Sequence, residues 1–82
     1  MKNELTRIYE KRLAELIQED FDNTKKRYKE IVRIKKQSNG NIQLYSHLYY
    51  HSKVLKECED EAEYIATEIE FTEQRLSELY QD

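Results

Sequence analysis

The sequence predicts an all-α fold: a long antiparallel two-helix hairpin, a coiled coil that dimerises into a four-helix bundle. Apolar residues recur at steps of three and four along most of the 82 residues, which is the period of an amphipathic helix. The chain has no proline, and Gly40 is its only glycine, so two long helices with one interruption can form. At this length we expect one domain, residues 1–82.

The first helix is expected over residues 3–38. Asn3 can serve as its N-cap, and Glu4 suits the positive end of the helix dipole. Two apolar rows lie slightly out of phase: Leu5, Tyr9, Leu13 and Leu16 in one, and Ala14, Ile17, Phe21, Thr24, Tyr28 and Ile31 in the other. This shift is typical of a stutter, or of a break near residues 22–24 that would make three helices. We expect one continuous helix.

The turn is expected at residues 39–41. Asn39 and Gly40 tolerate left-handed backbone and can end the first helix, while Asn41 can cap the next one. A β-hairpin at Asn39-Gly40 is the alternative, but it would need alternating apolar strands on both sides. That alternation does not extend beyond a few residues, so a helix-to-helix turn is favoured.

The second helix is expected over residues 42–80. Its apolar row advances by four and three through Leu44, Leu48, His51, Leu55, Cys58, Ala62, Ile65, Ile69, Thr72, Leu76 and Leu79. Such a narrow row is typical of a coiled-coil seam, in which His51 would form a polar layer. The residues predicted to form the oligomer core are Leu48, Leu55, Ile65, Ile69 and Leu76.

Charge is sorted along the chain. Residues 24–56 carry nine basic side chains and one acid, whereas residues 57–82 carry ten acids and one base. In the hairpin this sorting would place a basic tip at the turn and an acidic base at the termini. A second copy aligned antiparallel would set each tip beside the other chain's acids, so we expect a homodimer.

The basic tip is the predicted partner-binding surface. Its residues are Lys25, Lys29, Arg33, Lys36, Tyr45, Tyr49 and Tyr50. Positive charge beside aromatic rings suits either an acidic protein partner or the phosphates and bases of a nucleic acid. A nucleic-acid-binding hairpin therefore remains the alternative function.

Other chemistry has weaker support in the sequence. His47 and His51 stand one helical turn apart with Cys58 further along the same row, but no fourth ligand is suitably spaced for a metal. The acidic run from Glu57 to Glu63 could mimic a phosphate track, or it could be a solvated helix face. The sequence contains no phosphate-binding glycine loop and no recognisable catalytic cluster, so neither an enzyme nor a cofactor is expected.

The function expected from these features is that of a small interaction protein that binds and regulates or inhibits a larger protein. Its composition is typical of small phage and mobile-element proteins. The single cysteine, Cys58, suits a reducing compartment, and no apolar run approaches the length of a membrane span. We therefore expect a cytoplasmic protein that does not insert into membranes.

Overall fold

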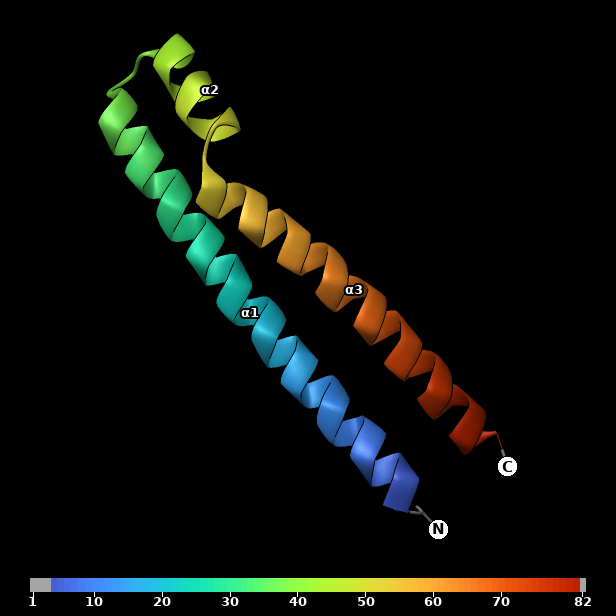
Figure 1. Cartoon of the computed structure of the whole chain (residues 1–82). Helices are drawn as coiled ribbons and strands as arrows, with labels where there is room; N and C mark the ends of the chain where they lie inside the picture. Colours follow the sequence, from blue (N-terminus) through green and yellow to red (C-terminus); the bar gives the residue numbers. More distant parts are fainter. Residues whose placement is uncertain (1–3, 82) are drawn as a thin grey trace.

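The computed structural model of the chain describes residues 4–81 and shows an elongated helical hairpin (Figure 1). Its helices are α1 (Glu4–Ser38), α2 (Ile42–Tyr50) and α3 (Lys53–Tyr80), and 92% of the described residues are helical. The rod measures 58 × 16 × 15 Å. α2 and α3 return alongside α1, so α1 begins and α3 ends at the same end of the rod. Residues 4–81 contain no strand, which confirms the all-α prediction.

The turn after α1 forms at the predicted residues. Asn39 and Gly40 both have left-handed backbone, with φ of 44° and 84°, and the Asn39 amide donates to the Lys35 carbonyl at 3.2 Å. Asn41 caps α2, because its side-chain oxygen accepts from the Leu44 amide at 3.1 Å. The predicted cap at Asn3 lies outside the described residues.

α1 is continuous through residues 22–24, as expected. The two apolar rows of its sequence are therefore two faces of one helix. The row that begins at Tyr9, Leu13 and Leu16 packs on α3, and it continues into the buried side chains of Glu30 and Ile34. The second row lies on a different side of α1. The phase shift thus separates the face of α1 that packs on α3 from a second face that does not, and α1 continues through it without a break.

The prediction of one helix over residues 42–80 was wrong. The chain breaks at His51 and Ser52, where α2 ends and α3 begins. Ser52 caps α3 by accepting from the Leu55 amide at 3.2 Å, and its hydroxyl also donates to Glu30 of α1 at 2.6 Å. This cross-helix bond and the new cap stabilise the break. His51 is exposed at the end of α2 and forms no polar core layer.

The core lies between α1 and α3. On α3 the buried residues are Leu55, Cys58, Ile65, Thr72 and Leu76. Leu48 and Ile69 are half-buried. Thr72 is accommodated in the core because its hydroxyl donates to the Glu68 carbonyl at 2.7 Å. The part of the seam that is fully buried is thus covered by α1 of the same chain.

Candidate interaction surfaces

A stripe of mostly apolar side chains on α1 is largely exposed, with only its last member, Ile31, half-buried. We call Ala14, Ile17, Phe21, Thr24, Tyr28 and Ile31 the α1 stripe. Ile17, Phe21 and Tyr28 are 56%, 58% and 68% exposed, although large apolar side chains at this spacing are normally covered. Lys25 lies over the Phe21 ring, with its Nζ 5.0 Å from the ring centroid.

The α1 stripe and the face of α1 that packs on α3 are separated by roughly 110° around the helix, at 100° per residue. Two apolar faces at such an angle are typical of a helix with two neighbours, as in a four-helix bundle. Within the hairpin, α1 has only one long neighbour, α3. One of its two faces is therefore uncovered.

α3 presents apolar side chains on the same side of the hairpin as the α1 stripe. Thr24 of the stripe and Ala62 of α3 line one groove between the helices. Ile69, seven residues beyond Ala62, projects from the same side of α3, and it lines a shallow hollow with Ala66. The α1 stripe and this edge of α3 together form one broad face, on which a second pair of helices could pack.

The groove that contains Thr24 and Ala62 also extends to the tip and has a volume of about 630 Å³. Its polar and aromatic lining includes Arg27, Tyr49 and Tyr50. Arg27 Nη2 lies 3.4 Å from the Tyr49 hydroxyl, and the Tyr49 ring is 5.6 Å from the Tyr50 ring in an edge-to-face arrangement. Lys56 adds a second positive charge to the groove.

The structure divides the predicted tip surface. Tyr45 and Tyr49 stack with ring centroids 6.0 Å apart, so the tyrosines do come together. Lys25 and Lys29, however, each stand two residues from Arg27 and project from nearly the opposite side of α1, about 200° away. The bases that share a groove with Tyr49 and Tyr50 are Arg27 and Lys56, and neither is among the predicted site residues.

The remaining predicted bases, Arg33 and Lys36, are also exposed. Lys36 lies seven residues beyond Lys29 and therefore on the same side of α1. Arg33 is engaged within the chain, because its guanidinium donates to Glu30 and, at 2.8 Å, to Gln37. The three predicted lysines thus follow the outer side of α1, Arg33 is engaged at the junction with Glu30, and none of the four lines the groove that contains Tyr49 and Tyr50.

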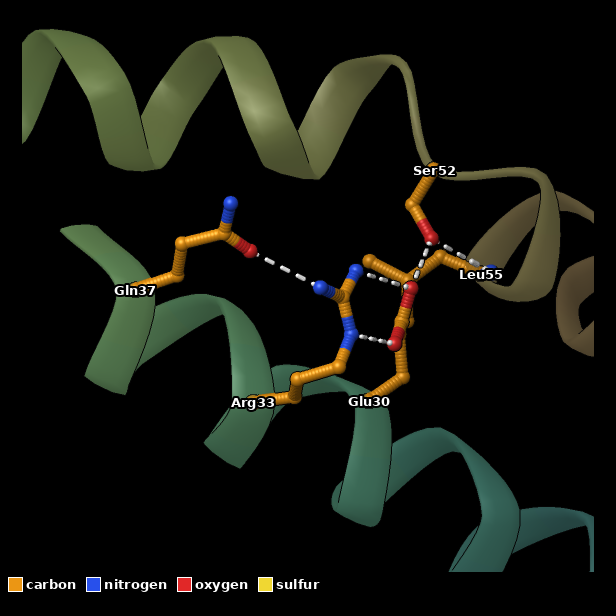
Figure 2. Close-up of polar contacts among 5 residues, drawn as sticks. All are labelled: Glu30, Arg33, Gln37, Ser52 and Leu55. Carbon is orange, nitrogen blue, oxygen red and sulfur yellow. Dashed lines mark hydrogen bonds and ion pairs between the residues drawn. The ribbon is translucent and has the colours of Figure 1, made fainter.

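Glu30 organises the junction between α1 and α3 (Figure 2). Its carboxylate accepts two hydrogen bonds from Arg33, at 2.7 and 3.1 Å, and a third from the Ser52 hydroxyl at 2.6 Å. These bonds, first those of Arg33 and then that of Ser52, lower the pKa of Glu30 from 4.5 to about 2. Only 8% of the side chain is exposed. Glu30 is therefore a buried, fully bonded carboxylate that holds the bend in place.

A second polar contact joins α1 to α3 seven residues before Glu30 along α1. The Asn23 side-chain amide donates to the Cys58 carbonyl at 2.8 Å. Asn23 occupies a position in the packing row of α1 where an apolar residue would be expected, and this bond accounts for a polar residue there. The sequence signal for Glu30 was its place as the lone acid in the basic segment, whereas Asn23 carried no comparable signal.

The histidine pair forms no metal cluster with its surroundings. The His47 and His51 rings lie 4.5 Å apart, while Cys58 is buried in the core of α3. Within residues 4–81 there is no group of three or more His, Cys, Asp or Glu side chains that could hold a metal ion. The two rings are a local contact at the end of α2.

No family model, no curated protein and no solved structure matches this chain. None of the helices between residues 4 and 81 combines the length and the apolar character needed to cross a membrane. The interpretation of its surfaces therefore depends on their own geometry and chemistry.

Proposed function

We propose that this chain is a small non-enzymatic interaction protein that pairs with a second copy as a four-helix bundle and binds a larger protein, which it regulates or inhibits. The observation that carries the proposal is the uncovered α1 stripe beside the apolar edge of α3. Contiguous apolar surface of this kind typically marks a protein-binding face. The lean composition of the chain supports the same view, because a short chain buries little surface unless it associates.

Self-association is tested by sedimentation equilibrium across the micromolar range, where a dimer has twice the 10.1 kDa mass of the chain. Phe21→Asp places a charge in the α1 stripe and should shift the equilibrium toward monomer. Phe71→Asp is the matched control, because Phe71 is a similarly exposed aromatic residue on the outer side of α3. If the wild-type chain is a monomer at high micromolar concentration, the four-helix dimer is wrong.

The larger partner is proposed to bind at the tip. Tyr50 is 81% exposed and Ile42 is 80% exposed, so apolar surface remains available there after the long helices have paired. Affinity purification from the source cells with wild-type and Tyr50→Ala chains, in the presence of nuclease, tests this step. A protein retained by the wild-type chain and lost with Tyr50→Ala would support the proposal. Equal recovery with both chains would contradict binding at the tip.

Nucleic-acid binding is the second candidate, and the groove lined by Arg27, Lys56 and the tyrosines favours it. Guanidinium and ammonium groups beside aromatic rings suit a single strand, whose phosphates and bases they contact together. Fluorescence anisotropy with labelled single-stranded RNA and DNA over a salt series tests this candidate. Submicromolar affinity at about 150 mM salt, falling steeply as salt rises, would favour it over protein binding.

A further inference from the structure

The spacing of residues in the α1 stripe is the same in both chain directions. Its members, from Ala14 to Ile31, are separated by steps of three, four, three, four and three residues. The midpoint of the stripe falls between Asp22 and Asn23, close to the midpoint of α1 itself, which runs from residue 4 to residue 38. A second α1 laid antiparallel across this midpoint would overlap nearly the whole helix. The stripe is thus suited to pair with itself.

We propose that the α1 stripe is covered by the α1 stripe of a second copy, packed antiparallel about a twofold axis between Asp22 and Asn23. The inference rests on the self-association proposed above and specifies its geometry. In this register Phe21 meets Thr24 of the second copy, and Ile17 meets Tyr28 of the second copy. Large side chains then face smaller ones, which is the condition for close interdigitation of two helices.

Charge supports the antiparallel direction. Residues 10–22 of α1 carry five acids and two bases, whereas residues 23–36 carry seven bases and one acid. Antiparallel pairing sets each acidic half beside a basic half, while parallel pairing would bring the two basic halves together. The same complementarity makes a second copy a better occupant of the stripe than an unrelated helix of uniform charge.

Asp20 and Arg27 flank the α1 stripe on its edge toward α3. Across the proposed axis Asp20 of each copy faces Arg27 of the other, so two symmetric ion pairs form. Both side chains are exposed in the single hairpin, and Arg27 makes a long hydrogen bond of 3.4 Å to the Tyr49 hydroxyl. Forming the pairs therefore requires no buried ion pair to be broken.

Complementary charge reversals test the register. Asp20→Arg turns both pairs of the homodimer into arginine–arginine pairs, and Arg27→Asp turns both into aspartate–aspartate pairs. Each variant alone should dimerise at least about tenfold more weakly than the wild type, because two ion pairs between the copies change from attraction to repulsion. An equimolar mixture restores both pairs, so the heterodimer should form with an affinity within about threefold of the wild-type value. Fluorescence anisotropy with one labelled chain measures all three equilibria.

Asp22→Arg and Lys29→Asp form the matched control. These residues are also seven apart, but they project about 130° away from the α1 stripe. Their reversal should change the dimerisation constant by less than about twofold. Loss of affinity in this pair equal to that of Asp20→Arg and Arg27→Asp would indicate a general charge effect and overturn the register.

Cysteine cross-linking gives a second readout that does not depend on charge. In a Cys58→Ala background, a mixture of Ile17→Cys and Tyr28→Cys chains should form a disulfide-linked heterodimer, because these positions meet across the axis. Rapid cross-linking of Ile17→Cys chains with one another would instead indicate parallel pairing and overturn the proposal. A wild-type dimer without rescue in the charge mixture refutes the register alone, whereas a monomeric wild type refutes the self-association as well.

Discussion

Glu30→Gln tests how strongly the hairpin depends on the junction between α1 and α3. Glutamine keeps the size of the side chain and an oxygen that can accept from Ser52, but it removes the charge that pairs with Arg33. In the folded chain, the bonds from Arg33 and Ser52 lower the pKa of Glu30 from 4.5 to about 2. Without screening, this shift would correspond to roughly 3 kcal/mol of free energy of unfolding at neutral pH. Solvent reaches Arg33 and screens the pair, so the expected loss in free energy of unfolding is about 1–2 kcal/mol.

The loss should depend on pH in a defined direction. Because the folded pKa lies below the ordinary value, the Glu30 carboxylate stabilises the hairpin above pH 4.5, and this contribution disappears as the pH falls from 4.5 to about 2. The difference in free energy of unfolding between wild type and Glu30→Gln should therefore be largest at neutral pH and close to zero at the acid end. Urea unfolding followed by far-UV circular dichroism, at one chain concentration, measures it.

Glu15→Gln is the control for a surface pair on the same helix. Glu15 lies 3.8 Å from Arg12, and solvent reaches both side chains, of which Glu15 is exposed and Arg12 half-buried, so replacing Glu15 should lower the free energy of unfolding by less than about 0.5 kcal/mol. A loss for Glu30→Gln no larger than for this control would refute the role of the junction. A difference that stays constant between neutral pH and about pH 2 would refute its electrostatic origin.

Three further predictions concern the turn and the core. Gly40→Ala should destabilise the hairpin by about 1–2 kcal/mol in thermal melting; the cause is the φ of 84°, since no atom lies within 4 Å of an added Cβ. Ile65→Ala should lower the free energy of unfolding, measured in urea, by about 2–4 kcal/mol. The same change at the half-buried Ile69 should lower it clearly less. The Cys58 thiol is 1% exposed and should react with a thiol reagent only as fast as the hairpin opens, so a fast reaction in the native chain would contradict the packing.

The turn could be predicted because its signals are local. A left-handed pair at Asn39-Gly40 followed by a capping Asn41 needs no information from distant parts of the chain, and the structure has each feature at the predicted residue. The all-α character was likewise readable from the spacing of apolar residues alone. Local backbone preference and helical period were sufficient for both.

The break at Ser52 could not be predicted from the same rules. Ser52 is a good N-cap residue, but a serine inside a helical pattern is tolerated in many helices. What distinguishes it is the bond to Glu30, which lies 22 residues away along the chain. The apolar seam from Leu48 to Leu55 gave no sign of an interruption, because a bend between two helices can preserve its three-and-four spacing.

The composition of the α1 face that packs on α3 shows why this face was hard to recognise from the spacing of apolar residues. It contains Asn23 and Glu30 at positions where apolar residues would have revealed the face, while Phe21 and Tyr28 made the α1 stripe look like the core. Each polar residue is explained by a bond to the other side of the hairpin, to the Cys58 carbonyl or to Ser52. The apolar residues of the stripe have no such explanation within one chain.

This asymmetry indicates how specificity is divided between the two faces of α1. The face toward α3 combines apolar burial with hydrogen bonds that accept only one alignment, because Asn23 and Glu30 must each meet a fixed partner on the returning segment. The stripe is mostly apolar and symmetric in its spacing, so its packing accepts more than one direction of pairing more readily than the polar contacts do. The flanking charges distinguish the directions most clearly, because the acidic and basic halves of α1 differ in sign. If the stripe pairs with the stripe of a second copy, the sorted charges favour antiparallel association, whereas the buried polar contacts determine how α1 aligns with α3 within the hairpin.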